Sequence, residues 1–259
     1  MKDTTQKEGY ILVYNNDFNE VYENHLTPMD AYVYVTMKLM AGNPHFFGRL
    51  YATADSICSF SFDIGLSDVS QSFIRELRLS MKRISENGYI PYELNNDKKP
   101  IRHVYTIGAV WEKDSKAKDN WKNERYTPIP ISACKKIFSA FGLSEMMKVR
   151  VLYFYIKLSS LISYKTGICT YSLDTIAEKT NLSVRTVQDY IRVLETYKVL
   201  AVYHMGENIK RYANYPANVL GQYYNKERVL LSGQASYEDF CSKYRLDKNG
   251  NKKSKQASA

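Results

Sequence analysis

Paired cysteines and clustered histidines are missing from this sequence. The four cysteines lie far apart, no two of them form a C-x-x-C pair, and the four histidines are equally scattered. No HxE or HExxH motif and no clustered set of acidic residues is present. These absences argue against a zinc knuckle and against a catalytic metal site, because such sites need ligands at short, fixed spacings.

Phosphate-binding glycine loops and long apolar runs are missing too. Neither GxxxxGK[ST] nor GxGxxG occurs, which argues against an ATPase or a helicase. The longest apolar stretch, residues 149–162, is interrupted by Arg150 and Lys157. It is too short to span a membrane and predicts a buried helix. We predict no metal ion, no cofactor, no membrane partner and no enzymatic activity.

The first ten residues, MKDTTQKEGY, contain no apolar segment of the kind that a secretion signal needs. Widely spaced cysteines without such a signal are typical of reduced thiols in a cytosol. A cytoplasmic location is therefore predicted.

Tyrosine is abundant, with 23 residues, which raises the question of a nucleophilic tyrosine that nicks DNA. Enzymes of that kind usually combine the tyrosine with a metal-binding histidine cluster, and this sequence has none. We therefore interpret Tyr153, Tyr155, Tyr223 and Tyr224 as packing residues.

The charge of the chain is strongly basic, with a formal net value of +9. Such a balance favours a polyanionic partner, either nucleic acid or an acidic membrane surface, and does not distinguish the two. The hydrophobic share of 44% is that of a globular protein and not of a disordered one.

The segment 172–204, SLDTIAEKTNLSVRTVQDYIRVLETYKVLAVYH, has the pattern of a helix-turn-helix. Leu173 and Ile176 face inward on the first helix, and Ala177 is the small residue where two helices cross. Asn181 fills the turn, where a left-handed conformation is often required and asparagine tolerates it. Leu182 fills the gap between the helices.

The second helix of this motif spans residues 183–197. Its predicted buried residues are Val187, Tyr190 or Ile191, and Leu194. Helices are also expected at 131–141 and 144–163, and a short strand at 170–171. A hairpin of strands 199–204 and 209–215 follows and would form the wing.

The outward face of the second helix carries the residues that we expect to read DNA. Arginine and glutamine make bidentate contacts to guanine and adenine, and valine can meet a thymine methyl group. Asp189 on the same face would repel phosphate and weakly favours a protein partner. The expected base-contacting residues are Val184, Arg185, Thr186, Gln188 and Arg192.

Phosphate contacts are expected beside this face. Ser172 and Ser183 stand at helix N-termini, where free backbone amides favour phosphate. His204, Lys210 and Arg211 lie in the hairpin, where they would hold the DNA backbone.

The first half of the chain repeats this order more loosely. A short helix at 55–62, a long helix at 67–87 and strands at 89–94 and 102–111 are expected. With an offset of 110 residues, RISENGYIPY corresponds to VLETYKVLAV. Arg185, Gln188 and Arg192 then correspond to Arg75, Arg78 and Lys82, which makes these three further candidate DNA contacts. The alternative is an unrelated amphipathic helix whose basic face is merely solvated.

The domain organisation follows from these elements. Residues 1–111 are predicted to form an N-terminal winged helix domain and residues 131–242 a C-terminal one. Residues 112–130 would be a linker, extended at YTPIP, or else a solvated extension of the hairpin. Residues 243–259 form a basic tail that we predict to be disordered, serving either to attract phosphate or to aid solubility.

The whole pattern resembles winged helix-turn-helix DNA-binding domains, of mainly α fold with small β-hairpin wings (α+β). Two such domains in tandem on a basic chain resemble the replication initiators of bacterial plasmids and phages. The segments YTPIP, LSEMMKVRVLYFYIKL and YSLDTIAEKTNLSVRTVQDYIRVLE are also similar to the N-terminal domains of DnaD-like replisome organisers. The resemblance covers residues 126–215, and 20–111 more loosely. It implies sequence-specific binding to double-stranded origin DNA and recruitment of host replication proteins.

The sequence is also compatible with two other functions. A transcriptional regulator of a mobile element would bind a single palindrome at a promoter, whereas an initiator would bind clustered direct repeats. A winged helix used only for protein contacts would be an adaptor, since fold does not fix function. A homodimer is also open, and it would set half-sites about one helical turn apart.

Overall fold

The computed structural model describes residues 9–18, 25–41, 51–87, 105–106, 126–206, 216–246 and 249. The helices in these ranges are α1 (Pro28–Ala41), α2 (Ala54–Phe62), α3 (Gln71–Glu86), α5 (Ile131–Phe138), α6 (Glu145–Leu161), α7 (Leu173–Thr180), α8 (Val184–Thr196) and α9 (Lys226–Lys243). The strands are β1 (Tyr10–Tyr14), β2 (Tyr51–Ala52), β3 (Tyr105–Thr106), β4 (Tyr126–Pro130), β5 (Ile168–Cys169), β6 (Leu200–Tyr203) and β7 (Val219–Gln222).

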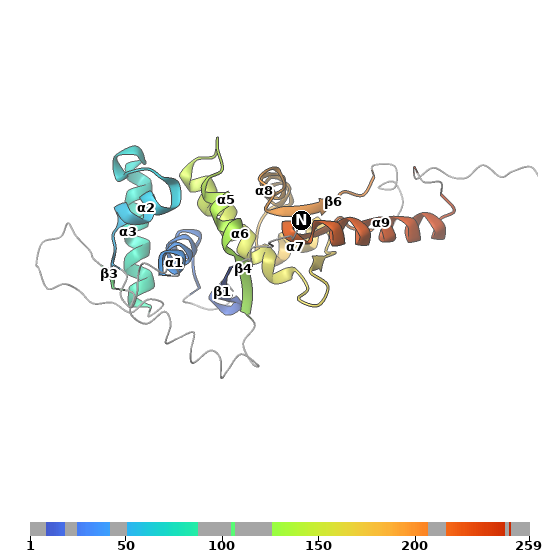
Figure 1. Cartoon of the computed structure of the whole chain (residues 1–259), viewed down its shortest axis with the longest axis horizontal. Helices are drawn as coiled ribbons and strands as arrows, with labels where there is room; N and C mark the ends of the chain where they lie inside the picture. The colour runs from blue at the N-terminus through green and yellow to red at the C-terminus, as the bar shows by residue number, and fades with distance from the viewer. Residues whose placement is uncertain are drawn as a thin grey trace, which may run out of the picture. The chain divides into compact units, whose positions relative to one another are not determined.

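The described part of the chain is mainly helical with small antiparallel sheets (Figure 1). β1 pairs with β4, β2 pairs with β3, and β5, β7 and β6 form a three-stranded sheet in that order. This confirms the predicted α+β class with small β-hairpins. The apolar stretch at 149–162 is the buried helix α6, in which Val149, Leu152 and Phe154 are fully enclosed.

The chain divides into two compact units, Met1–Ser160 and Leu161–Ala259. This division differs from the expected boundary between residues 130 and 131. β4, expected as the end of the linker, pairs with β1 from Tyr14↔Tyr126 to Tyr10↔Pro130. The pairing joins residues more than a hundred positions apart, so no local pattern could indicate it.

The first unit is built around an aromatic cluster. The ring of Tyr32 on α1 stacks on Phe62 of α2, with centroids 5.3 Å apart. Phe138 of α5 meets both rings edge-on, at 5.8 Å from Tyr32 and 6.0 Å from Phe62. This contact explains why residues 131–138, expected in the C-terminal domain, belong to the first unit: aromatic rings of this size bury a large apolar area.

α1 begins at a reciprocal cap and is tied to α3. The Thr27 amide and hydroxyl donate to the Asp30 carboxylate at 3.0 and 2.7 Å. The same carboxylate, which is 3% exposed, accepts from the Arg83 guanidinium of α3 at 2.9 Å. A buried carboxylate needs such partners, so this ion pair fixes how α3 lies on α1.

Within the first unit, α1, β2, α2, α3 and β3 follow one another between β1 and β4, and β2 is antiparallel to β3. The expected helices at 55–62 and 67–87 correspond to α2 and α3, the latter preceded by a short 3-10 turn at Leu66–Asp68. The expected strand at 89–94 lies outside the described residues. Of the expected strand at 102–111, residues 105–106 are described, and they form β3.

The second unit carries the three-stranded sheet together with α7, α8 and α9. β5 occupies 168–169, two residues earlier than the strand expected at 170–171. The described partner strand of β6 is not 209–215, which lies outside the described residues, but β7 at 219–222. β7 also pairs with β5, which places it at the centre of the sheet.

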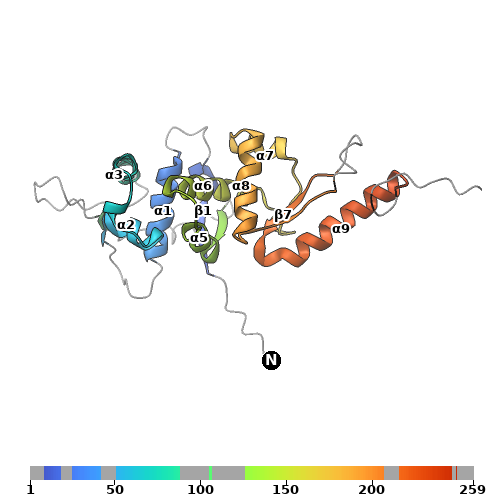
Figure 2. The same ribbon diagram turned by 90° about the horizontal axis from the view of Figure 1, so that it is seen from above.

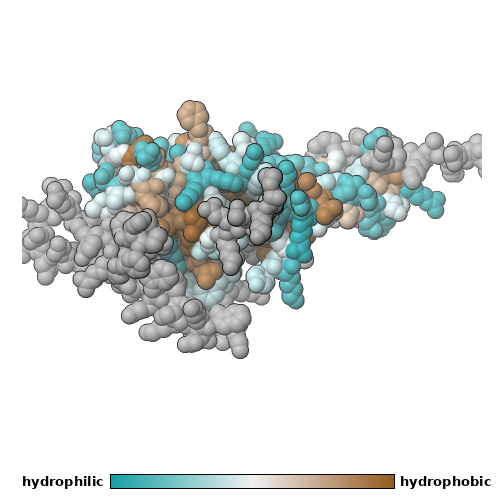
Figure 3. Space-filling view, viewed as in Figure 1, coloured by the Kyte–Doolittle hydropathy of each residue, from teal (hydrophilic) through white to brown (hydrophobic). Residues whose placement is uncertain are grey.

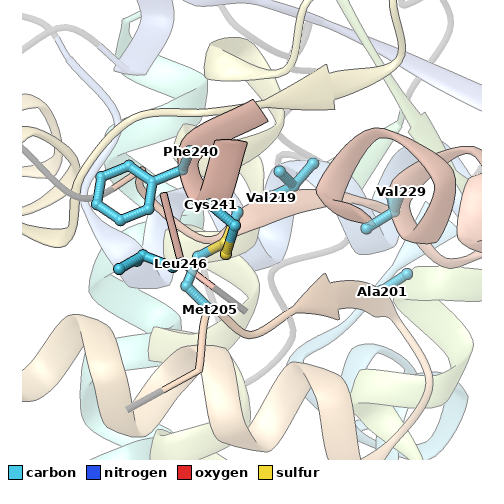
Figure 4. Packing of buried hydrophobic residues seen from close by; sticks show 7 residues of the cluster. All are labelled: Ala201, Met205, Val219, Val229, Phe240, Cys241 and Leu246. Atoms are coloured by element: carbon cyan, nitrogen blue, oxygen red, sulfur yellow. The ribbon is translucent and has the colours of Figure 1, made fainter. Parts of the chain in front are cut away.

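α9 was not predicted from the sequence, and it packs along β6 and β7 (Figures 1 and 2). Figure 4 shows the resulting cluster, which includes Val229 and Phe240 of α9.

Residues 243–259 were predicted to form a disordered tail, and this prediction is wrong for the first residues of the segment. The Tyr244 ring lies 4.6 Å from that of Phe240, and Leu246 is 3% exposed within the same cluster. The apolar side chains hold this segment on the fold.

All four cysteines are buried and unpaired. In the parts of the chain that the structure describes, no helix has both the length and the apolar character needed to cross a membrane.

Candidate nucleic-acid interface

The helix-turn-helix of the second unit consists of α7 and α8, which pack against each other (Figure 2). Each helix begins at a serine whose side chain caps it. Ser172 Oγ accepts from the Thr175 amide and Ser183 Oγ accepts from the Thr186 amide, both at 3.1 Å. Each serine hydroxyl also lies within hydrogen-bond distance of the threonine hydroxyl three residues later. Such caps define helix starts where other backbone amides remain unpaired.

The turn between the helices has the predicted left-handed residue. Asn181 has φ 55° and ψ 46°, and the amide of Leu182 donates to the carbonyl of Ala177 at 3.0 Å. Ala177 is 6% exposed, as expected for the small residue where helices cross. Ile176 is fully buried, whereas Leu173 and Leu182 are half-buried. This turn therefore sets the angle at which α8 leaves α7.

The buried face of α8 contains all four residues that the sequence offered for it. Val187 and Leu194 are 0% exposed, Ile191 is 5% exposed and Tyr190 is 9% exposed. The sequence left Tyr190 and Ile191 as alternatives, and both are buried. With these residues fixed in the core, the opposite side of α8 is available to a partner.

Arg185 and Arg192 are exposed on that opposite side, one above the other at a spacing of seven residues. Gln188 lies between them and is half-buried. Arg192 approaches Asp189 at 3.5 Å, with side chains 74% and 56% exposed. Arg185 makes no ion pair with any described residue. Val184 and Thr186 are half-buried at the helix start, so they contribute less surface than Arg185.

The wing contributes one described candidate. His204 follows β6, and its Nε2 lies 3.0 Å from both carboxylate oxygens of Glu195 on α8. This contact ties the end of β6 to the helix. Lys210 and Arg211, the other two predicted wing contacts, lie outside the described residues.

α3 in the first unit matches α8 position by position at the offset of 110 residues. The buried residues of α8 correspond to Leu77, Ser80, Met81 and Ile84, all of which are buried. The three predicted basic residues are exposed at the corresponding outward positions. These residues are Arg75, Arg78 and Lys82.

The outward face of α3 is more basic than that of α8. Lys82 lies 3.6 Å from Glu86, with both side chains more than 60% exposed. Among the described residues, Arg75 and Arg78 form no ion pair. α3 also begins one turn earlier than α8, after the cap Ser70, whose Oγ accepts from the Phe73 amide at 3.2 Å.

Two residues at these faces were missed by the sequence reasoning. Glu195 was not expected to hold His204, because a contact between a helix and a strand leaves no local pattern. Leu79, 43% exposed in the middle of the outward face of α3, was also missed. The offset of 110 residues could have indicated Leu79, because it aligns Leu79 with Asp189 on the outward face of α8.

The face of the molecule drawn in Figure 3 mixes hydrophilic side chains with small hydrophobic patches. Among the described residues, no group of three or more histidine, cysteine or acidic side chains is placed to hold a metal ion.

A family model described as a helix-turn-helix domain matches residues 149–200, which run from α6 through α7 and α8 to the start of β6. No curated protein and no solved structure matches the chain. The match, together with the geometry of α7 and α8, supports DNA binding in general.

Proposed function

We propose that this protein binds double-stranded DNA in a sequence-specific manner, with α8 in the major groove. The observation that carries the proposal is the outward face of α8, where Arg185, Gln188 and Arg192 stand opposite a fully buried apolar face. Arginine and glutamine are the side chains that read guanine and adenine edges by bidentate hydrogen bonds.

The helix starts supply the complementary phosphate contacts. Ser172 and Ser183 place the N-termini of α7 and α8, and a helix N-terminus favours an anion through its free amides and dipole. His204, held by Glu195, and Lys210 and Arg211 further along would contact the backbone beside the groove. Phosphate contacts set the register of the helix, and base contacts then discriminate between sequences.

The first unit is proposed to bind DNA in the same way through α3. Within this unit α1, β2, α2, α3 and β3 follow one another as α6, β5, α7, α8 and β7 do further along the chain, where β6 stands between α8 and β7. In both sets the strand after the first helix is paired antiparallel with the last strand. Arg75, Arg78 and Lys82 would then be the contacts of a second reader in tandem with the first.

Two readers on one chain suit a replication initiator or replisome organiser of a plasmid or phage, which binds repeated sites at an origin and recruits host replication proteins. Linking two binding modules raises the overall affinity when both sites lie within reach. A regulator of transcription would use the same contacts at a promoter, so the position of the sites on the replicon distinguishes these roles.

The proposal is tested by selecting bound duplexes from a random-sequence pool with the full-length chain. The selection is repeated with the double variant Arg185→Ala/Gln188→Ala, and with Arg228→Ala/Ser242→Ala as the control. The control removes one arginine and one neutral polar side chain from exposed positions on α9. A defined motif selected by the wild type and the control, but not by the α8 variant, supports base reading by α8.

If the wild type selects no motif, the protein is not a sequence reader, and the protein adaptor becomes the better account. Footprints of the selected motif on the replicon then assign the role. Clustered repeats at an origin support the initiator, and a single palindrome at a promoter contradicts it.

A further inference from the structure

The outward face of α3 has one apolar side chain at its centre. Leu79 is 43% exposed. The structure describes every side chain of α3, and the other exposed residues of this helix are polar or charged. They are Gln71, Ser72, Arg75, Arg78, Lys82 and Glu86.

Leu79 is flanked by cations on the same helix face. Arg75 precedes it by four residues and Lys82 follows it by three, and residues at these spacings are neighbours on a helix surface. A single exposed leucine is common and by itself indicates nothing. The cations on both sides, however, attract a polyanion across this surface, which would bring Leu79 against it.

The corresponding position on α8 is Asp189, which is 56% exposed on its side chain. Its carboxylate lies 3.5 Å from the Arg192 guanidinium. That neighbour offsets the negative charge of Asp189, so the carboxylate can approach DNA at a lower electrostatic cost than an isolated one. The two helices thus share their buried pattern but differ in chemistry at the same outward position.

We infer that Leu79 and Asp189 are specificity-determining residues that select different bases. An apolar side chain favours the 5-methyl group of thymine, and a carboxylate accepts a hydrogen bond from the N4 amino group of cytosine. The recognised DNA therefore has two unlike halves, one with a thymine opposite Leu79 and one with a cytosine opposite Asp189. This inference rests on the proposed function, in which α3 and α8 both enter the major groove.

The test uses the full-length chain and a duplex selected from the random pool. Each thymine is replaced in turn by deoxyuridine, which removes only the 5-methyl group, and Kd is measured for the wild type and for Leu79→Ala. At one position the replacement should weaken wild-type binding about fourfold, the effect of removing one buried methyl group. The same replacement should leave Kd of Leu79→Ala unchanged, because alanine is too short to reach the methyl group.

Leu231→Ala is the matched control, since Leu231 is 72% exposed on α9 and the chemical change is the same. This variant should keep the full sensitivity to deoxyuridine. The random-pool selection is also repeated with Asp189→Asn. The motif that this variant selects should show a weaker preference for cytosine in the other half.

The inference is overturned if no thymine responds to deoxyuridine, if Leu79→Ala responds as the wild type does, or if the two halves of the motif are identical. In those cases a selected motif still supports DNA reading by the chain. The absence of any motif would instead contradict the proposed function, and with it this inference.

Discussion

At the scale of single residues, Asn181 decides how α7 and α8 meet. Its left-handed conformation, φ 55°, lets the chain turn within one residue, and the amide of Leu182 closes the turn on Ala177. Side chains with a Cβ disfavour this region, asparagine less than most, and glycine adopts it freely. The sequence predicted this feature because the turn between two such helices often requires a left-handed residue, and asparagine tolerates that conformation.

Asn181→Ala should lower the free energy of unfolding by about 1–2 kcal/mol, the cost of the left-handed conformation for an ordinary residue. Asn181→Gly is the control, because it also removes the side chain but has no conformational cost. We expect the urea midpoint of Asn181→Gly to lie clearly above that of Asn181→Ala. Equal midpoints would mean that the asparagine side chain matters and the backbone conformation does not.

The thiol of Cys134 on α5 is 0% exposed, and burial raises its pKa from the ordinary 9.0 to about 12. The folded protein therefore keeps this proton at pH values where the unfolded chain has released it. Its contribution to stability is fully present below pH 9 and is lost as pH rises toward 12.

The wild type should consequently lose stability faster than Cys134→Ala as the pH rises above 9. The extra loss is about 1 kcal/mol between pH 9 and 10, since one pKa unit corresponds to ~1.4 kcal/mol. Urea unfolding at pH 8, 9 and 10 measures it. Parallel curves for the two proteins would show that this thiol titrates alike in the folded and unfolded chains.

At the scale of elements, α9 depends on a close approach to β6. A Cβ atom added at Gly233 would lie 2.1 Å from Cγ and 2.5 Å from Cβ of Tyr203. The Tyr203 hydroxyl donates to Gln234 on α9 at 3.0 Å, which holds this ring in place. The close approach explains a glycine in the middle of a helix, where it is otherwise unfavourable.

Gly233→Ala should destabilise the protein by about 1–3 kcal/mol, because overpacking outweighs the better helix propensity of alanine. Ala235→Ser, at an exposed position two residues later, should change the urea midpoint little. Unaltered stability in Gly233→Ala would mean that α9 moves away from β6 without cost.

The same elements show what a sequence can predict. α8 was predicted well because it has apolar residues at helical spacing and a serine at its start. α3 was predicted from its apolar residues alone, and it begins at Gln71 and not at residue 67. α9 was missed because its buried residues, among them Val229, Gly233 and Phe240, form a sparse pattern and Leu231 is exposed. The pairing of β7 with β6 and β5 was missed because strand partners are chosen by contacts distant in sequence.

At the scale of the whole molecule, the excess positive charge of +9 is proposed to serve DNA binding through two helices. Of the predicted DNA contacts, Arg75, Arg78 and Lys82 are exposed on α3 and Arg185 and Arg192 on α8, where the pattern of apolar residues had placed them. The division after Ser160 was not predictable, because it follows from the pairing of β1 with β4 and from the aromatic packing of Phe138.

The triple variant Arg75→Ala/Arg78→Ala/Lys82→Ala should bind DNA with a weaker salt dependence than the wild type. The slope of log K against log salt changes by about 0.9 for each phosphate that the protein no longer neutralises, so a reduction of up to about 3 is expected. The control, Lys226→Ala/Arg228→Ala/Lys243→Ala, removes the same charge from α9 and should leave the slope nearly unchanged. Equal slopes in both triple variants would contradict DNA binding by α3.

The most direct test of the account is the specificity ratio, the Kd for a scrambled duplex divided by the Kd for the selected duplex at one salt concentration. Arg185→Ala/Gln188→Ala should lower this ratio by at least about tenfold, since each bidentate pairing with a base contributes about 1–3 kcal/mol. Its Kd for the scrambled duplex should change far less. A ratio equal to that of the wild type would contradict the claim that α8 reads the DNA sequence.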